Sequence, residues 1–217
     1  MKKDLTELVF ILDMSGSMSH LADDTIGGFN SVLKEHKDGQ GEILVTTYLF
    51  NNESRMIHDR LPIADVPPMT VKDYSARGST AILDAIGEAI EHVVGIHRYI
   101  REEDIPEHTV FVITTDGMEN ASHRFSAEHI RNKIKHEQEK YGWEFLFLAA
   151  NIDAAETAES YGIDRRHAVD YSADEEGTFA VYESVNYAMH NVRKRGRVDS
   201  DTAWRDKVDT DYRRKKQ

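Results

Sequence analysis

Three apolar runs, at residues 8–12, 109–115 and 143–150, place the strongest constraint on how this chain can fold. They are rich in β-branched or aromatic residues, and the polar residues that follow them are Asp13, Asp116 and Asn151. Continuous apolar runs of this length are typical of strands that are buried on both faces. We therefore expect central strands of a parallel sheet, the first of them over residues 5–13.

Helical patterns lie between these runs. The strongest covers residues 80–100, where apolar side chains recur at three- and four-residue steps and Ser79 or Thr80 is the expected N-cap. The others are expected at 21–37, 126–141, 177–195 and, from an Asp153 cap, to about residue 161. Gly27 and Gly28 lower the helix propensity of residues 21–37, so we expect the first turn of that helix to be irregular.

Alternating strands and helices predict the class of the fold. It is α/β, with a doubly wound, mostly parallel central sheet and helices on both faces. Residues 43–50 and 54–58 are two extended runs around Asn51 and Asn52, which predicts a hairpin and one antiparallel edge strand. Residues 59–78 should be mostly loop, and a short last strand is expected at 168–171.

The chain has 217 residues, which fits one such domain with an extension. We expect the domain over residues 1–194 and a charged C-terminal tail over 195–217. Residues 193–217 hold ten Lys and Arg against five Asp, a net charge of +5, so residues 1–192 carry −17, from 17 basic and 34 acidic side chains. A net charge of −12 for the whole chain argues against nucleic acid or an anionic membrane as a partner.

The sequence contains no cysteine, which excludes disulfides, thiolate metal sites and cysteine nucleophiles. It has no run of about 18 apolar residues that could span a membrane. The first eight residues do not resemble a secretory signal, so we expect a cytoplasmic protein.

Polar residues gather where strands end and where the strongest helix begins. Three short motifs carry them: Asp13-x-Ser15-x-Ser17, Gly78-Ser79-Thr80 and Thr115-Asp116-Gly117. In an open α/β sheet, ligands bind beyond the carboxyl ends of the strands. The five side chains Asp13, Ser15, Ser17, Thr80 and Asp116 would supply two carboxylates and three hydroxyls, which are ligands that Mg²⁺ prefers.

These three motifs, in this order, resemble the metal-ion-dependent adhesion site of the von Willebrand factor A domain family. The resemblance covers about residues 5–194 and implies that the same five side chains form the ligand set. It implies a protein-binding module, not an enzyme, in which bound Mg²⁺ or Mn²⁺ engages a Glu or Asp of a partner protein. The chain is more similar to intracellular bacterial members of the family than to the extracellular adhesive ones. The resemblance does not indicate an oligomeric state.

The competing hypothesis is a Mg²⁺-dependent phosphohydrolase of the haloacid dehalogenase type. Such enzymes place Asp-x-Asp after the first strand and use the second Asp as general acid, whereas Ser15 cannot do this at neutral pH. They also need a lysine near the phosphate, and the basic residue nearest to the three motifs is Arg77. A serine hydrolase is disfavoured because Ser15 lacks the Gly-x-Ser-x-Gly elbow.

Other polar residues have two interpretations each. Glu119, Asn120 and Asn151 either contact a partner on the rim of the site or are solvated loop residues, and Asp84 either bonds a metal-bound water or is an acid favoured near a helix N-terminus. The eleven histidines show no zinc-binding spacing. The basic end at 213–216 either binds an acidic partner or nucleic acid, or folds back on the acidic body, which we favour.

Overall fold

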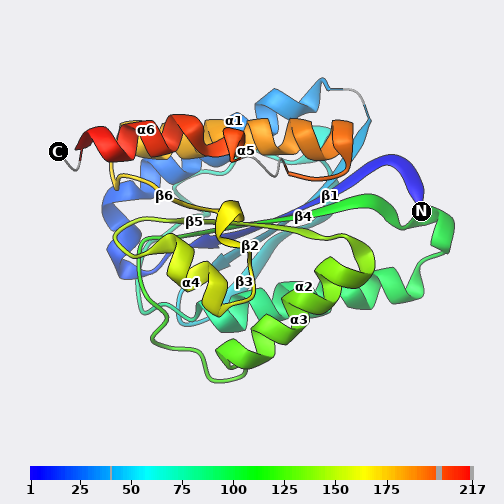
Figure 1. Ribbon diagram of the computed structural model, residues 1–217, viewed down its shortest axis with the longest axis horizontal. Helices are drawn as coiled ribbons and strands as arrows, with labels where there is room; N and C mark the ends of the chain where they lie inside the picture. Colours follow the sequence, from blue (N-terminus) through cyan, green and yellow to red (C-terminus); the bar gives the residue numbers. More distant parts are fainter. Residues whose placement is uncertain (40, 199–201, 216–217) are drawn as a thin grey trace.

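The computed structural model describes residues 1–39, 41–198 and 202–215. Within these ranges a six-stranded sheet lies between two layers of helices (Figure 1). The strands are β1 (Lys2–Asp13), β2 (Glu42–Phe50), β3 (Ser54–Pro62), β4 (Pro106–Thr115), β5 (Glu144–Ala149) and β6 (Ala168–Asp170). The α-helices are α1 (Ala22–Lys37), α2 (Ile82–Tyr99), α3 (Ala127–Tyr141), α4 (Ala154–Ser160), α5 (Glu175–Arg195) and α6 (Asp206–Lys215).

The strand order is β3-β2-β1-β4-β5-β6. Every neighbouring pair is parallel except β2 and β3, which form the antiparallel hairpin at one edge. The expected fold class is therefore confirmed. β1 and β4 lie in the middle, and residues 8–12 and 110–113 are fully buried because helices cover both faces of these strands. This burial on both faces is the physical reason for the continuous apolar runs in the sequence.

Each face of the sheet has its own core and its own helices. The side chains of β1 alternate between the two cores, with Phe10 on one side and Ile11 on the other. Helices α1, α5 and α6 cover the first face, and α2, α3 and α4 cover the second (Figure 1). The helices expected from the sequence are all present, with ends that differ by a few residues.

Helix α1 is continuous through Gly27 and Gly28, so the expected irregular beginning is wrong. The six residues before the helix form a 3-10 turn, η1 (Gly16–Leu21), instead. Gly28 is buried where α1 packs against α5, and a Cβ atom there would lie 2.0 Å from Cδ2 of Tyr182. The missing side chain therefore allows the Tyr182 ring to lie against the helix backbone.

We expect Gly28→Ala to destabilise the protein by about 1–3 kcal/mol, because the buried ring of Tyr182 has to move. Gly27→Ala is the matched control on the same helix, since a Cβ there meets nothing within 4 Å. It should instead stabilise the helix by up to about 1 kcal/mol. Urea unfolding of the two variants measures the difference, and equal effects would contradict this account of the α1–α5 contact.

The described part of the charged C-terminal segment folds back on the body of the protein. Residues 203–205 form a 3-10 turn, η5 (Ala203–Arg205), which leads into α6 along α5. Trp204 is 2% exposed, and its indole Nε1 donates a hydrogen bond to the carbonyl oxygen of Arg166 at 3.0 Å. Trp204 and Val208 thus form the apolar face of this segment. Both belong to the core to which α5 also contributes.

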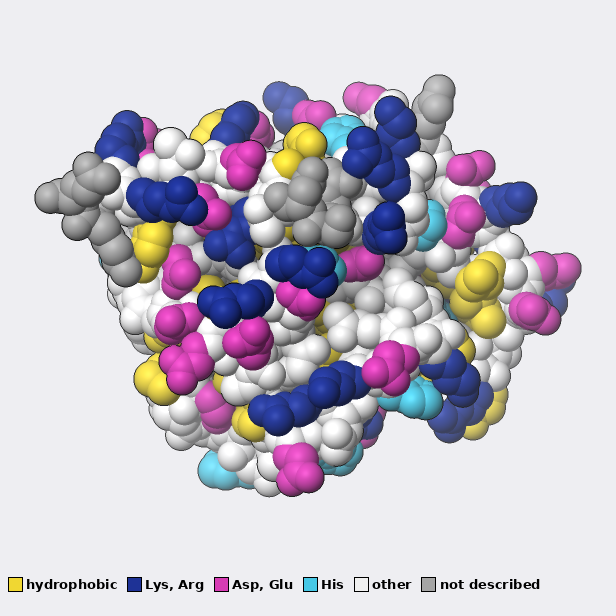
Figure 2. Space-filling view, in the orientation of Figure 1, with side chains coloured by type: hydrophobic (Ala, Val, Ile, Leu, Met, Phe, Trp, Pro, Cys, Tyr) yellow, Lys and Arg dark blue, Asp and Glu magenta, His cyan; other side chains and the backbone are white. Residues whose placement is uncertain are grey.

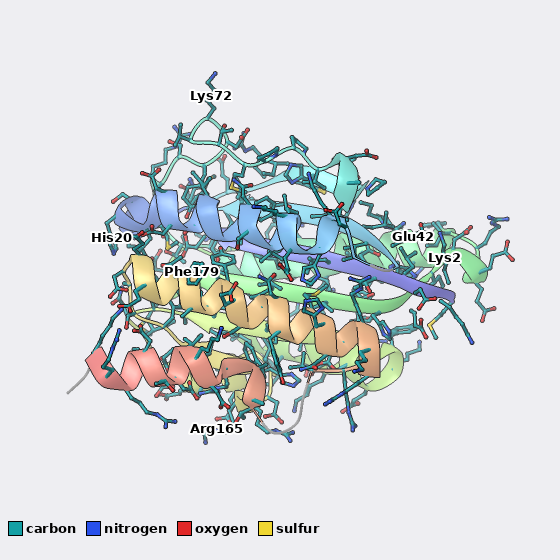
Figure 3. The ribbon with its side chains drawn as sticks, turned by 90° about the horizontal axis from the view of Figure 1, so that it is seen from above. Lys2, His20, Glu42, Lys72, Arg165 and Phe179 are labelled. Atoms are coloured by element: carbon teal, nitrogen blue, oxygen red, sulfur yellow. The ribbon has the colours of Figure 1, made fainter. Side chains whose placement is uncertain are left out.

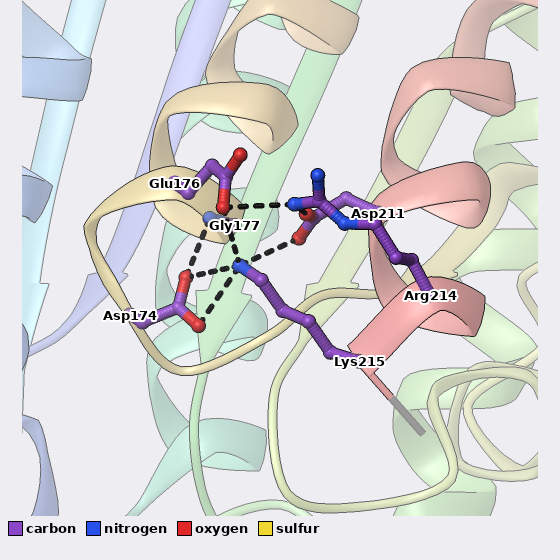
Figure 4. A network of polar contacts seen from close by, with 6 residues as sticks. All are labelled: Asp174, Glu176, Gly177, Asp211, Arg214 and Lys215. Carbon is purple, nitrogen blue, oxygen red and sulfur yellow. Dashed lines mark hydrogen bonds and ion pairs between the residues drawn. The ribbon is translucent and has the colours of Figure 1, made fainter. Parts of the chain in front are cut away.

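Ion pairs hold the end of α6 against the beginning of α5 (Figure 4). Nζ of Lys215 lies 2.7 Å from Oδ1 of Asp174 and 3.0 Å from Oδ2 of Asp211, and Arg214 pairs with Glu176 at 2.9 Å. Basic and acidic side chains are accordingly interspersed on the face seen in Figure 2. The basic end of the chain contacts the acidic body as favoured from the sequence, with Lys216 lying outside the described residues.

A buried histidine lies where α1 packs against α5 on the first face of the sheet. His36 of α1 is 2% exposed, and its ring centroid is 4.9 Å from that of His190 on α5. Burial lowers the pKa of His36 to about 4, and the positive charges of His190 and Arg193 act in the same direction. The folded protein therefore keeps this imidazole neutral.

The unfolded chain takes up a proton on His36 below its ordinary pKa of 6.5, whereas the folded protein resists protonation down to about 4. Between these two values acidification favours unfolding, and His36 costs up to about 1.4 kcal/mol of stability per pH unit. We therefore expect His36→Leu to lose less stability than the wild type between pH 7 and pH 4.5. Urea unfolding at both pH values measures this, with His136→Gln, at an exposed position, as control. Equal pH dependence in His36→Leu and the wild type would contradict it.

Candidate functional site

The carboxyl ends of β1 and β4 meet at the centre of one edge of the sheet. The two strands are parallel neighbours, with Leu12 beside Thr114. The next residues of the two strands are joined directly, since Oγ1 of Thr115 donates a hydrogen bond to Oδ2 of Asp13 at 2.6 Å. Asp116 follows at once, so both predicted carboxylates lie at the same edge.

The turn after β1 carries the two serines into contact with these carboxylates. The amide of Ser15 donates to Oδ1 of Asp13 at 2.7 Å, and its Oγ lies 3.2 Å from Oγ of Ser17. The hydroxyl of Ser17 then donates to Oδ1 of Asp116 at 2.5 Å. The turn thus links the ends of β1 and β4 through side-chain oxygen atoms.

Thr80 comes from the long loop before α2. The amide of Gly16 donates to the carbonyl of Gly78 at 3.0 Å, which holds this loop against the serine turn. A Cβ atom on Gly117 would lie 3.7 Å from both Oγ of Ser17 and Oγ1 of Thr80, so the two hydroxyls flank the same point. Gly78 has φ +78°, and a Cβ there would lie 2.4 Å from Oδ1 of Asn52. Glycine fits this close approach for both reasons.

The five side chains expected to hold a metal therefore lie at one edge of the sheet. Four of them, Asp13, Ser15, Thr80 and Asp116, are at most 4% exposed, and Ser17 is exposed. Their role as ligands stays a prediction. In the described part of the chain no group of three or more His, Asp and Glu side chains is placed to hold a metal ion. The candidate site is of another kind than such a group, because it combines only two carboxylates with the oxygen atoms of three hydroxyls.

The site carries negative charge that its hydrogen bonds compensate only in part. Burial raises the pKa of Asp13 to about 6, although hydrogen bonds from Thr115 and Ser15 lower it, and the charge of Asp116 raises it further. Oδ2 of Asp116 is buried and has no hydrogen-bond partner. Buried polar atoms are nearly always partnered, so an unpartnered carboxylate oxygen beside a second buried carboxylate is chemically suited to a cation.

Three residues support the site in roles that the sequence did not indicate, although Asn120 was expected on its rim. Thr115 was quoted in its motif but given no role, and its hydroxyl holds Asp13. The hydroxyl of Tyr74 donates to the backbone carbonyl of Asp13, and no pattern in the proline-rich loop indicates it. Asn120 brackets Thr80 with two hydrogen bonds of 3.0 Å, accepting from its amide and donating to its carbonyl. Asn120 is thus a positioning residue for Thr80.

The beginning of α2 differs from the prediction. Ala81 is the N-cap, without a side-chain hydrogen bond, so neither Ser79 nor Thr80 caps the helix. A distant loop satisfies the helix amides instead, because Oε2 of Glu119 accepts from the amide of Leu83 at 3.1 Å and Oγ of Ser122 accepts from that of Asp84 at 3.1 Å. Local sequence cannot show a cap that comes from about 40 residues away.

Asp84 and Glu119 hold the loop at residues 119–125 in place through hydrogen bonds from its backbone amides. The carboxylate of Asp84 accepts from the amides of three consecutive residues, at 2.8–2.9 Å: His123, Arg124 and Phe125. These bonds lower the pKa of Asp84 despite its partial burial. Glu119 likewise accepts from the amides of Ala121 and Ser122 at 2.8 and 2.7 Å. Asn151 lies exposed after β5, and its contact with a partner stays a prediction.

Comparisons with solved structures identify the architecture. The vWF domain of the type V pili tip protein Mfa5 from Porphyromonas gingivalis matches with a TM-score of 0.64 at 9% identity, over 89% of this chain and 98% of that one. A von Willebrand factor type A structure from Catenulispora acidiphila matches with a TM-score of 0.58 at 12% identity, over 86% of this chain and 42% of that one. The fold is that of a von Willebrand factor A domain.

A third match is to a structure that holds zinc. Proximal thread matrix protein 1 from the mussel byssus, described as having a zinc-occupied MIDAS motif, matches this von Willebrand factor A fold with a TM-score of 0.56 at 15% identity. The match covers 89% of this chain and 46% of that one, so the present chain spans about half the length of that protein. No model of a protein family and no curated protein sequence matches the chain. None of the helices in the described ranges is both long and apolar enough to cross a membrane.

We expect Asp84→Asn to loosen the segment over residues 121–125, because the three backbone amides donate to both carboxylate oxygens and an amide side chain keeps only one of these acceptors. The amides of residues 123–125 should exchange faster with solvent, and stability should fall by about 1–3 kcal/mol. Hydrogen exchange and urea unfolding measure both effects. Glu91→Gln is the matched control, since Glu91 lies on the same helix and makes a surface ion pair with Lys133. Unchanged exchange at these three amides would contradict the anchoring role of Asp84.

Proposed function

We propose that this von Willebrand factor A domain is a metal-dependent protein-binding module. The observation that carries the proposal is the buried, unpartnered Oδ2 of Asp116, which lies in a cluster of oxygen atoms at the carboxyl edge of the sheet. A carboxylate oxygen in such a position loses its hydration without gaining a hydrogen bond. A divalent cation would compensate it, together with the partly compensated charge of Asp13.

The ligand set that we propose is Asp13, Ser15, Ser17, Thr80 and Asp116. Two carboxylates balance the charge of Mg²⁺ or Mn²⁺, and the three hydroxyls add neutral oxygen ligands. Some of these side chains can act through water. The bound ion would supply a local positive charge with a coordination position for an oxygen atom from outside the chain.

That outside ligand would be a Glu or Asp side chain of a partner protein. The acidic body of the domain repels such a side chain at long range, since residues 1–192 carry a net charge of −17. The attraction must therefore be local and must come from the ion. This makes recognition depend on the metal rather than on the overall charge of the surface.

The fold comparisons support this proposal at the level of architecture. One further match is a pilus adhesin, SpaC from Lactobacillus rhamnosus GG, with a TM-score of 0.61 at 12% identity over 86% of this chain and 30% of that one. At such identities the likeness concerns the fold alone. The metal and the acidic partner residue are proposals that rest on the residues of this chain.

The expected result for the metal is saturable binding of Mg²⁺ and Mn²⁺, measured by isothermal titration calorimetry. Asp116→Asn should weaken binding at least about tenfold, because it removes one of the two carboxylates and leaves Asp13 as the only charged ligand of the ion. The matched control is Asp23→Asn, which removes an exposed carboxylate from α1. Equal losses in both variants, or no binding by the wild type, would refute the ligand assignment.

The function itself is tested by an affinity pull-down from the native host with and without EDTA. A partner retained in Mg²⁺ should be lost with the chelator and return when Mg²⁺ or Mn²⁺ is restored. Asp13→Ala should abolish retention without unfolding the protein, which circular dichroism checks. Retention that is insensitive to EDTA would show that the ion does not mediate binding.

The phosphohydrolase hypothesis has a separate test. Oγ of Ser15 lies against that of Ser17, and the backbone amide of Arg77 donates to the carbonyl of Met14. Neither contact supplies the general acid or the phosphate-binding lysine that such an enzyme needs. A phosphatase screen with Mg²⁺ should therefore show no turnover, and turnover that disappears in Asp13→Ala would replace our proposal.

A further inference from the structure

A small pocket lies at the end of the sheet opposite to the candidate metal site. β4 runs from Pro106, which lines the pocket, to Thr115 at the site. Ten residues at about 3.3 Å per residue separate the two places by about 30 Å. In Figure 3 the labelled His20, whose ring contacts the carbonyl of Ser17 at 2.8 Å, lies at one end, and Lys2 lies at the other. The pocket is therefore separate from the proposed metal centre.

Helices α2 and α3 and the amino-terminal part of β4 enclose this pocket, whose volume is about 200 Å³. Its walls are mainly apolar and aromatic: Val94, Ile105, Pro106, Tyr141 and Trp143. Pockets for drug-sized ligands have volumes of about 300–1,000 Å³. A pocket of this size suits a single ring or a short alkyl group.

Two glutamates line this apolar space, and Glu107 accepts a hydrogen bond from the backbone amide of Asp4 at 2.8 Å. Glu137 lines the pocket, is 6% exposed, and its Oε2 is buried without a hydrogen-bond partner. It lies on the core-facing stripe of α3, which it shares with the buried Ile130 and Ile134. A helix position that faces the core usually carries an apolar residue. Core packing therefore does not explain why position 137 is a glutamate.

The nearest lysines are occupied elsewhere. Lys133, one turn before Glu137, has its Nζ 3.0 Å from Oε1 of Glu91. Lys140 lies with its Nζ 4.9 Å from the centroid of the Tyr141 ring. Both reduce the pKa of Glu137 at a distance, yet burial outweighs them and the pKa of this carboxyl is raised.

The basic side chains that line the pocket, His97 and Arg98, do not pair with Oε2 of Glu137 either. His97 directs its Nε2 to Oε2 of the buried Glu7 at 2.7 Å. Arg98 lines the pocket from an exposed position and forms no ion pair with Glu137 in the described part of the chain. In the described part of the chain, Oε2 of Glu137 is therefore buried without a cationic partner.

The aromatic walls favour the same kind of ligand. Trp143 is 5% exposed and is held between Phe111, with ring centroids 5.4 Å apart, and His97, with centroids 5.5 Å apart. A fixed indole ring attracts cations through its π face, and the attraction increases when the ion is desolvated. A carboxylate and an indole in one small apolar pocket therefore complement a positive charge on a compact apolar body.

We propose that this pocket binds a small organic monocation, an ammonium group carrying one ring or a short alkyl chain. The ammonium would lie against Oε2 of Glu137, and its apolar part would fill the space beside Trp143. A neutral molecule of the same shape would gain only the apolar contacts. An anion would meet the carboxylate and be excluded.

The test uses benzylammonium as the probe, with benzyl alcohol as its neutral counterpart and benzoate as its anion. Titrations followed by ¹H–¹⁵N NMR report on the indole signals of the two tryptophans, which Trp143→Phe assigns. Benzylammonium should shift the Trp143 signal saturably and leave that of Trp204, which lies under α6, unchanged. Benzyl alcohol should bind at least tenfold more weakly, and benzoate should not bind.

Glu137→Gln keeps the size of the side chain and removes its charge. It should reduce the affinity for benzylammonium at least tenfold and leave that for benzyl alcohol unchanged, whereas Glu139→Gln, at an exposed position of the same helix, should change neither. Thermal unfolding checks that both variants fold. Equal affinity for the cation and the alcohol, or an unchanged affinity in Glu137→Gln, would overturn the proposal.

Arg98 provides the last comparison. If the pocket is open to an outside cation, Arg98→Gln should bind benzylammonium at least as tightly as the wild type. If binding appears only in Arg98→Gln, the carboxylate serves the chain's own guanidinium and the proposal is wrong. The absence of any saturable shift for benzylammonium in the wild type at millimolar concentrations would also refute it.

Discussion

A hydrogen bond from the Thr115 hydroxyl to the buried carboxylate of Asp13 joins the two central strands where the candidate site is built. It depends on the parallel pairing of β1 and β4, which sets the ends of both strands at the same level. Burial raises the pKa of this carboxyl to about 6 even with the hydrogen-bond donors that surround it. Because the negative charge of Asp13 is compensated only in part, this edge of the sheet is suited to a cation. The same carboxylate also holds the turn after β1, since it accepts a hydrogen bond from the amide of Ser15.

Carboxylates and amides of the neighbouring loop hold the rest of this edge in place. Asn120 brackets the backbone of Thr80, while Glu119 and Asp84 fasten the loop to the first turn of α2. These groups accept backbone hydrogen bonds, so they fix positions rather than offer themselves to a ligand. The serine and threonine hydroxyls are thereby held in place by backbone contacts, and such preorganisation lowers the cost of binding an ion or a partner.

Among the residues that the structure describes, Asp116 and Glu137 each have a buried carboxylate oxygen with neither a hydrogen bond nor an ion pair, and the two lie toward opposite ends of the same sheet. Their surroundings differ in a way that separates the proposed ligands. Asp116 lies beside a second carboxylate and hydroxyl oxygens, which is the donor set of a hard metal ion. Glu137 lies among aromatic and aliphatic side chains, where an organic cation can bury its apolar part. Both inferences rest on the cost of leaving a buried charge uncompensated.

The sequence by itself determined the fold class, the strands and the first five α-helices, because burial on one or both faces leaves a local periodic pattern. It did not indicate α6, which lies in the segment expected as a charged tail. It also located Asp13 and Asp116, since a polar residue that ends an apolar run must lie at the edge of the sheet. Only the tertiary structure decided which contacts those residues make. The cap of α2 by Glu119, the contact of Gly28 with Tyr182 and the burial of Trp204 join segments far apart in the chain. No local pattern records such contacts, because their energies depend on neighbours that the fold brings together.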